Sequence, residues 1–253
     1  MHRIGVFDSG IGGLTVLRQL RRAFPQLDMV YLGDTARVPY GGRSVETITH
    51  YAEDDVRFLL RKDVEAIVIA CGTVSSNSLD ALREKFDLPI YGVIESAARL
   101  AASMTKTRSV GVIGTQATVK SEAYETHIRA IDPGVHVVSR ACPLFVPLVE
   151  NGIAPDDIVA ETVCSRYMEA FDGKNIDALI MGCTHYPVYR PALEKRLPGV
   201  RMIDVGEALA EALRPLFAES GGTGAVEYYV TERSAAFDEI VRVMDPSLDP
   251  AAI

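Results

Sequence analysis

Short apolar runs and longer amphipathic stretches alternate along almost the whole chain. Residues 4–7 form an apolar run that ends in a glycine-rich loop. Apolar residues then recur every three or four positions from Leu14 to Phe24, and Pro25 ends the pattern. The same succession of strand, loop and helix recurs many times, which is typical of an α/β protein with mostly parallel sheets.

This pattern predicts the positions of most strands and helices. The predicted strands lie at residues 4–7, 29–32, 66–70, 89–94, 110–113, 135–138, 178–181, 201–205 and 226–231. The predicted helices lie at residues 14–24, 45–59, 117–131, 158–171, 188–197 and 234–243, with a further helix that runs through Leu79 and Leu82. Ser44 is placed to cap the second helix, whereas Pro143 and Pro147 predict a loop after the strand at 135–138.

The second half of the chain repeats the pattern of the first. Residues 66–71 (AIVIAC) resemble residues 178–183 (ALIMGC), and each segment is an apolar run that ends in cysteine. The two segments are 112 residues apart, as are Glu95 and Glu207. We therefore expect two similar α/β units around a central cleft. Residues 208–253 exceed the second repeat, so this tail is expected to return and pack on the first half.

Composition and charge narrow the class of protein. With 253 residues and 48% hydrophobic residues, the chain can build one large domain or two of ordinary size. A net charge of −8 argues against nucleic acid or an anionic membrane as the main partner. The sequence has no apolar stretch long enough to span a bilayer and no signal-peptide pattern at its start. The four cysteines are therefore expected to be free thiols in a reducing cytoplasm.

Two of the cysteines are candidates for catalysis. Cys71 and Cys183 each follow a predicted strand and precede a helix-like pattern, at the edge where open α/β sheets bind ligands. The positive end of a helix dipole there would lower the pKa of a thiol from about 8.5. Two opposed thiols suit the removal of a proton from one face of a carbon and the return of a proton to the other. The alternative, a buried packing residue, is favoured for Cys142, which precedes Pro143, and for Cys164, which falls inside a predicted helix.

A glycine-rich loop follows the first predicted strand. Residues 8–13 (DSGIGG) can bring backbone amides close to a carboxylate or phosphate. The dinucleotide fingerprint lacks its third glycine, because Thr15 stands there, although Asp34 imitates the ribose-binding acid of such folds. Asp8 suits the binding of an ammonium group or assistance in proton transfer; its alternative is a simple turn aspartate.

Further polar candidates follow other predicted strands. His185 lies two residues after Cys183, lacks companions for a zinc site, and could assist that thiol. The hydroxyl-rich residues 72–76 and 114–118 could hold a carboxylate by neutral hydrogen bonds, or could simply cap helices. We interpret the other histidines as surface or packing residues: His2, His50, His127 and His136.

Five motifs in order resemble the glutamate racemase family. They are residues 7–16 (FDSGIGGLTV), 31–41 (YLGDTARVPYG), 111–119 (GVIGTQATV), 143–150 (PLFVPLVE) and 182–187 (GCTHYP). The likeness extends from residue 4 to about residue 210. Five ordered motifs are far more specific than any single one of them.

The resemblance implies a cofactor-independent racemase of L- and D-glutamate that supplies D-glutamate for peptidoglycan, and thus for cell-wall biogenesis and cell shape. It implies two pseudo-symmetric, doubly wound α/β domains around a cleft. The first, residues 1–97 plus 208–253, would carry Asp8 and Cys71; the second, residues 98–207, would carry Cys183. A homodimer and a cytoplasmic location are also expected, with no metal, nucleic acid or membrane as partner.

The resemblance also implies roles for single residues. Cys71 would take the α-proton from D-glutamate and Cys183 from L-glutamate, with Asp8, His185 and Glu150 as helpers. The expected substrate contacts are Asp8, Ser9, Pro39, Tyr40, Gly41, Gly72, Thr73, Thr115, Thr118, Thr184 and His185.

One position departs from the family pattern, and three other functions stay open. The family commonly has asparagine after the first cysteine, where this chain has Gly72, so a substrate contact there must come from backbone, water or a neighbouring group. The alternatives are an aspartate racemase, a dinucleotide-dependent oxidoreductase and a non-catalytic amino-acid-binding protein. Exchange of the substrate α-hydrogen with solvent would separate the last of these from a racemase.

Overall fold

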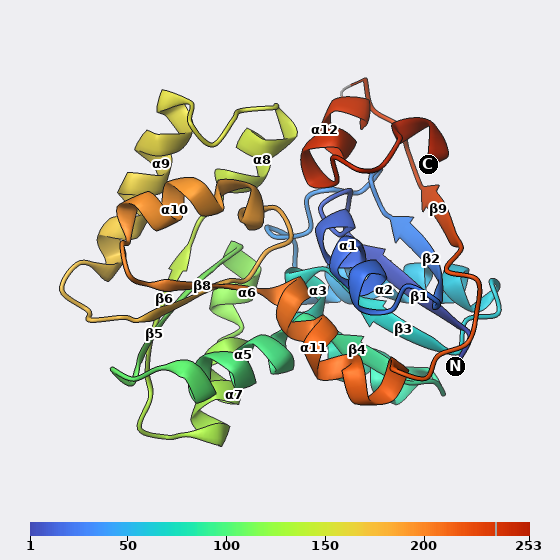
Figure 1. Cartoon of the computed structure of the whole chain (residues 1–253), viewed down its shortest axis with the longest axis horizontal. Coiled ribbons are helices and arrows are strands. Elements are labelled where there is room, and N and C mark those ends of the chain that lie inside the picture. Colours follow the sequence, from blue (N-terminus) through green and yellow to red (C-terminus); the bar gives the residue numbers. More distant parts are fainter. Residues whose placement is uncertain (236) are drawn as a thin grey trace.

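Two parallel sheets organise the computed structural model, which describes residues 1–235 and 237–253 (Figure 1). The first sheet has the strand order β4-β3-β1-β2-β9, and the second has the order β6-β5-β7-β8. The first sheet comprises β1 (Arg3–Asp8), β2 (Asp28–Gly33), β3 (Ala66–Ile69), β4 (Ile90–Gly92) and β9 (Val226–Val230). The second comprises β5 (Ser109–Gly114), β6 (His136–Ala141), β7 (Ala178–Met181) and β8 (Arg201–Asp204).

The repeat in the sequence corresponds to a repeat in the fold. Strands β1 to β4 have the same neighbours in the first sheet as β5 to β8 have in the second. Every strand pair is parallel. The two-unit, mostly parallel α/β architecture expected from the sequence is therefore confirmed. Strand β9 adds to the first sheet beside β2, so the tail does return to the first half.

Helices connect the strands and cover the sheets. They are α1 (Leu14–Ala23), α2 (Val45–Leu60), α3 (Gly72–Asn77), α4 (Leu79–Lys85), α5 (Val93–Met104), α6 (Gln116–Lys120), α7 (Ala123–Ile131), α8 (Phe145–Glu150), α9 (Ile158–Met168), α10 (Arg190–Arg196), α11 (Val205–Phe217) and α12 (Phe237–Met244). Three short 3₁₀ helices are η1 (Glu169–Phe171), η2 (Tyr186–Tyr189) and η3 (Pro250–Ala252). Ser44 caps α2 as expected, because its side chain accepts a hydrogen bond from the Thr47 amide.

Alternate residues of β1 face two different apolar cores. Phe7 packs with residues of α2 and α3 on one face of the first sheet. Val6 faces a larger core that continues into the second sheet, where it includes Ile113. Helices α1, α11 and α5 pack in succession between the sheets (Figure 1). The domain boundaries expected near residues 97 and 207 fall inside α5 and α11, and the division into domains stays a prediction.

Several predicted elements have different limits in the structure. The strand expected at 89–94 is shorter, because pairing with β3 ends at Gly92 and α5 begins at once. The helix expected at 117–131 is broken into α6 and α7, since Glu122 has a left-handed backbone with φ of 52°. The helix expected at 188–197 is a 3₁₀ turn followed by α10, because Pro191 has no amide to continue one helix.

The strand expected at 135–138 is β6 at 136–141, and α5 and α11 were not predicted as helices. Further differences are at helix ends and around the two prolines. The helix expected at 158–171 ends at Met168 and continues as η1. The helix expected at 234–243 is α12, and residue 236 of that prediction lies outside the described residues. Pro143 precedes a short helix, but Pro147 lies inside α8 rather than in a loop. A proline is tolerated in a first helical turn, since those amides have no intrahelical partner anyway.

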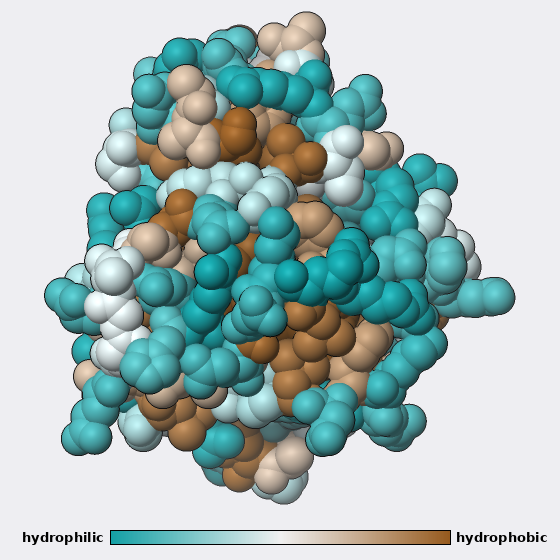
Figure 2. Space-filling view, turned by 90° about the vertical axis from the view of Figure 1, so that its right-hand side faces the viewer, coloured by the Kyte–Doolittle hydropathy of each residue, from teal (hydrophilic) through white to brown (hydrophobic). Residues whose placement is uncertain are grey.

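The surface is mainly hydrophilic. Figure 2 shows the face on the side of β9 and α12, where apolar groups lie in separate patches between hydrophilic side chains. Within the described part of the chain, no helix combines the length and the apolar character that crossing a membrane requires.

Candidate active site

A cavity of about 330 Å³ lies where the carboxyl ends of strands from both sheets meet. The first half contributes Ser9, Val38, Pro39, Tyr40, Gly41, Gly42, Cys71, Gly72 and Thr73 to its lining. The second half contributes Thr115, Gln116, Pro143, Val146, Pro147, Glu150, Cys183, Thr184, His185 and Tyr186. The volume suits a small molecule such as one amino acid. The repeat thus places one cysteine from each half on the same cavity.

Cys71 follows β3 and occupies the N-cap position of α3. Its side chain is 5% exposed, and its Sγ donates a hydrogen bond to Ser9 Oγ at 3.4 Å. Burial, and next the negative charge of Asp8, raise the pKa of the Cys71 thiol to about 12. The sequence prediction of a lowered pKa at this site is therefore wrong. The six-residue helix α3 offers only a weak dipole, and desolvation outweighs it.

Cys183 follows β7 and is 7% exposed. The chain after it forms a turn and the 3₁₀ helix η2, not the α-helix that the sequence predicted. A helix dipole therefore does not account for the environment of this sulfur. Its polar neighbour is His185, whose Nδ1 lies 3.9 Å from Cys183 Sγ.

His185 connects Cys183 to an acidic group. Its Nε2 lies 3.1 Å from Glu150 Oε1, and the imidazole is 3% exposed. Burial lowers the pKa of His185, but hydrogen bonds to Cys183 and Glu150 and their negative charges outweigh it and raise the pKa to about 10. The ring is therefore an imidazolium at neutral pH. The imidazolium thus places a positive charge 3.9 Å from the Cys183 sulfur.

Asp8 lies at the end of β1 and is fully buried. Its Oδ2 accepts hydrogen bonds from the amides of Gly10 and Gly13, at 3.1 and 3.0 Å. Its Oδ1 is buried without a partner in the described structure. Burial raises the pKa of Asp8, and the charge of His185 and the two amides act against that rise. Asp8 does not line the cavity; it lies near enough to Cys71 for its charge to raise the pKa of that thiol.

Hydroxyl groups link the two halves at the cavity. Thr73 Oγ1 and Thr115 Oγ1 are 3.0 Å apart, and Thr115 Oγ1 is 3.0 Å from Thr118 Oγ1. Thr118 is buried behind Thr115 and does not line the cavity. A further link joins the halves where Thr15 Oγ1 donates to the carbonyl of Thr184 at 3.0 Å. Both hydroxyl-rich segments singled out in the sequence thus contribute to the cavity lining, and Thr115 of the second segment also caps α6.

The cavity also has lining residues that the sequence did not indicate. These are Val38, Gly42, Gln116, Pro143, Val146, Pro147 and Tyr186. The α8 residues among them were missed because two prolines suggested a loop. Pro147 followed by apolar residues is a pattern that could have indicated α8, because proline is common in the first turn of a helix.

The other two cysteines do not line this cavity. Cys142 and Cys164 are buried in the apolar core, at 0% and 1% exposure, as expected for packing residues. All four cysteines are free. Among the residues the structure describes, no group of three or more His, Cys, Asp or Glu side chains is gathered to hold a metal.

Asp34 is engaged within the protein. Its carboxylate accepts hydrogen bonds from Tyr40 Oη, from Arg37 Nε at 2.5 Å and from Thr231 Oγ1 at 2.9 Å. A carboxylate so occupied is unsuited to the ribose of a dinucleotide.

Comparisons with known proteins find relatives over almost the whole chain. The profile of the family described as Asp/Glu/hydantoin racemase matches residues 4–213. A glutamate racemase from Aquifex aeolicus is 46% identical over 242 residues, which cover 96% of this chain and 93% of that protein. The solved structure of glutamate racemase from Francisella tularensis in complex with D-glutamate is 36% identical, with a TM-score of 0.91 over 98% of this chain and 95% of that one. An aspartate racemase from Picrophilus torridus, 18% identical with a TM-score of 0.62 over 86% of this chain and 95% of that one, shares the fold.

Proposed function

Because the chain belongs to the Asp/Glu/hydantoin racemase family, we propose that it interconverts L-glutamate and D-glutamate without a cofactor. The observation that carries the proposal is that Cys71 and Cys183, one from each repeat, line the same amino-acid-sized cavity. Relatives that are 41–46% identical over nearly the whole chain are glutamate racemases. The resemblance to an aspartate racemase extends only to the fold, so glutamate is the preferred substrate.

The reaction transfers one proton from the α-carbon and returns another to its opposite face. The Cys183 thiolate removes the α-proton of L-glutamate, so that the Cα–H bond breaks and an S–H bond forms. The electron pair left on the α-carbon delocalises into the α-carboxylate. The Cys71 thiol then gives its proton to the other face and becomes a thiolate. D-glutamate reacts by the same steps in reverse.

The two sulfurs have different environments. Burial and the Asp8 charge keep the proton on Cys71. The His185 imidazolium, which bonds Glu150, lies 3.9 Å from Cys183 Sγ.

Neutral donors around the cavity hold the substrate. The hydroxyls of Ser9, Thr73, Thr115 and Thr184 and the loop at Pro39–Gly41 are the groups that we assign to the substrate carboxylates and ammonium. Such donors stabilise the charge that develops on the α-carboxylate. Asp8 and Thr118 act from behind the lining, Asp8 through Cys71 and Thr118 through Thr115.

The cellular role follows from the product. D-glutamate is a building block of peptidoglycan, so we assign the chain to cell-wall biogenesis in the cytoplasm, where four free cysteines remain reduced. We also propose that it forms a homodimer, as the family resemblance implies; sedimentation equilibrium measures the mass directly.

One experiment tests substrate and chemistry together. The protein is incubated in D₂O with L- or D-glutamate and, in parallel, with the two aspartate enantiomers. NMR measures loss of the α-proton, and chiral chromatography measures inversion. We expect exchange and inversion with both glutamates and at least about a hundredfold less with aspartate. Binding of glutamate without exchange would identify a binding protein, and preferred turnover of aspartate would overturn the choice of substrate.

The oxidoreductase alternative has its own measurement. The structure leaves Asp34 no free role in ribose binding, and position 15 lacks the glycine of the fingerprint. Titration with NAD and NADP should therefore leave the thermal unfolding temperature unchanged.

A further inference from the structure

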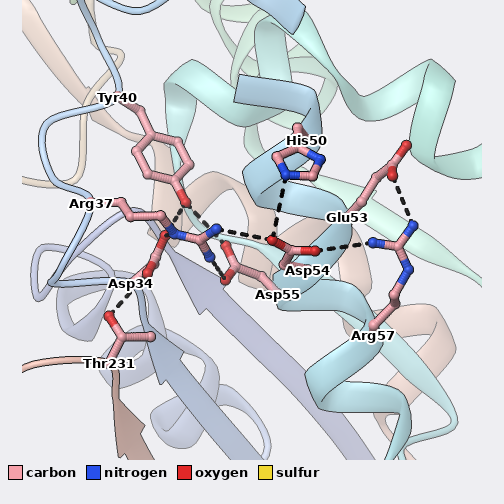
Figure 3. A network of polar contacts seen from close by, with 9 residues as sticks. All are labelled: Asp34, Arg37, Tyr40, His50, Glu53, Asp54, Asp55, Arg57 and Thr231. Carbon is pink, nitrogen blue, oxygen red and sulfur yellow. Dashed lines mark hydrogen bonds and ion pairs between the residues drawn. The ribbon is translucent and has the colours of Figure 1, made fainter. Parts of the chain in front are cut away.

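Tyr40 joins the cavity to a cluster of charged residues behind it. The residue lines the cavity, yet it is 1% exposed, and its hydroxyl points into a cluster with Asp34, Arg37 and Asp55 (Figure 3). The proposed substrate loop, residues 39–41, contains Tyr40. The cluster therefore holds this loop in position from the side of the first sheet.

The loop is also held on the opposite side. The carbonyl of Gly41 accepts a hydrogen bond from the amide of Ala117, at 3.1 Å. The segment before the loop is tied to the end of β9, since the Ala36 amide donates to Thr231 Oγ1 at 2.9 Å. The phenol of Tyr40 is thus one of a few anchors that set where the loop meets the cavity.

The hydrogen bonds of the Tyr40 hydroxyl require a second proton nearby. Its oxygen contacts Asp34 and also lies 3.4 Å from Asp55 Oδ2. A phenol has one proton, and the shorter contact assigns it to Asp34. An ionised Asp55 would then point a negative oxygen at the lone pairs of the phenol, whereas a protonated Asp55 can donate to them.

The charges around Asp55 also favour the acid form. Asp55 and Asp34 are 2% and 0% exposed, and both contact the single guanidinium of Arg37, which also bonds Asp54 at 3.0 Å. Within the part of the chain that the structure describes, Arg37 is the only cation bonded to either buried carboxylate. One guanidinium cannot neutralise two buried carboxylates.

The other described residues around Asp55 form no ion pair with it. From β9 and its end, Tyr229 and Thr231 face the hollow that Asp55 lines, and Lys62 Nζ bonds the Tyr229 hydroxyl at 2.7 Å. On α2, His50 and Arg57 contact the half-buried Asp54 rather than Asp55 (Figure 3).

We propose that Asp55 carries a proton in the active protein and that the chain from the Asp55 carboxyl through the Tyr40 hydroxyl to the Asp34 carboxylate positions the substrate loop. The proposal rests on the proposed function for the identity of the substrate. Asp55 is a positioning residue that acts through Tyr40. Burial, and next the charge of Asp34, raise the pKa of Asp55 to about 8, which agrees with the geometry. Loss of this proton at alkaline pH breaks the chain and loosens the loop.

The Asp55→Asn variant tests the proposal, since an amide can donate to the phenol and accept from Arg37 but cannot ionise. We expect the wild-type KM for glutamate to rise relative to that of Asp55→Asn, by at least about threefold between pH 7 and 9.5. The substrate and the catalytic thiols titrate in both proteins, so their effects on KM cancel in the ratio of the two KM values. Asp54→Asn is the matched control, because Asp54 bonds the same Arg37 but its side chain is 42% exposed and does not bond Tyr40. The ratio of its KM to the wild-type KM should stay constant.

A folding measurement gives an independent result without substrate. The folded chain keeps a proton on Asp55 that the unfolded chain releases near pH 4, so the unfolded state binds fewer protons between about pH 4 and 8. The equilibrium constant for folding of the wild type should therefore fall about tenfold per pH unit relative to that of Asp55→Asn in that window. Above the window, the ratio of the two constants should no longer change with pH. If the folding constants of the two proteins depend on pH in the same way across the window, the proposal is wrong whether or not glutamate is racemised. If the protein racemises glutamate but the ratio of the two KM values does not change with pH, the proposal is also wrong.

Discussion

Gly72 lies so close to the carbonyl oxygen of Gly182 that a Cβ added at residue 72 would stand 2.2 Å from it. Each glycine is adjacent to one of the two cysteines, so this contact sets how closely the two sulfur-bearing loops approach. A side chain at residue 72 has no space in this arrangement. The sequence suggested that a substrate contact is lost because residue 72 lacks the asparagine amide common in the family. In the structure, the absence of a side chain at this residue allows the backbone contact between the halves.

The first prediction concerns this contact. Gly72→Ala should force the two loops apart and lower kcat/KM at least about fivefold, because overpacking a tightly packed site typically costs about 1–3 kcal/mol. Gly42→Ala is the matched control, since Gly42 lines the same cavity and a Cβ there would meet nothing within 4 Å. Steady-state kinetics of both variants test this prediction. If the two variants lose the same amount of kcat/KM, the Gly72 contact has no special role.

The second prediction concerns the two thiols. Cys71→Ser and Cys183→Ser should each lower racemisation at least about a hundredfold, because a hydroxyl is a poor base at neutral pH. In D₂O, Cys71→Ser should exchange the α-hydrogen only of L-glutamate, and Cys183→Ser only that of D-glutamate.

Cys164→Ala serves as the control for the loss of a buried thiol, since Cys164 does not line the cavity. It should keep racemisation close to that of the wild type. Normal racemisation by either serine variant would exclude the two-thiol mechanism.

The third prediction concerns pH. The Glu150 carboxylate helps to raise the pKa of His185 to about 10, so Glu150→Gln should lower that pKa and the imidazolium should be lost earlier as pH rises. Between pH 7 and 9, kcat/KM of the variant should fall at least about threefold more than kcat/KM of the wild type does. Glu161→Gln, which removes a surface partner of Lys195, should follow the wild-type profile. Identical profiles for all three proteins would show that Glu150 does not control the imidazole.

The fourth prediction concerns the reactivity of Cys71. With a pKa of about 12, Cys71 should be alkylated by iodoacetamide at a rate that rises about tenfold per pH unit between pH 7 and 10. Asp8→Asn removes a charge that raises this pKa, so Cys71 in that variant should react faster at a given pH. Peptide mass spectrometry measures the rate at Cys71; a rate independent of pH would mean that the thiol is already ionised.

The sequence predicted the repeat and most of the site because both depend on local pattern. Apolar runs that end in small polar residues mark strand ends, and parallel strands bring those ends together at Cys71 and Cys183. The family resemblance indicated Ser9, and the spacing from Cys183 indicated His185; both residues line the cavity.

The features that the sequence did not predict depend on burial and on contacts between distant segments. Desolvation reverses the expected effect of the helix end on Cys71, and no local pattern reveals how deeply a thiol will be buried. The contact of Asp55 with Tyr40 joins α2 to a loop through the fold, fifteen residues apart in the chain. The closeness of Gly72 to Gly182 depends on how the two halves pack.

Strand β9 also has a consequence for how the chain assembles during its synthesis. A ribosome makes a protein from its amino terminus, so all four strands of the second sheet have been made before the last edge of the first sheet exists. Until then β2 has an unpaired edge, a site where other nascent chains can pair. The half that begins first on the ribosome is thus the half that is completed last.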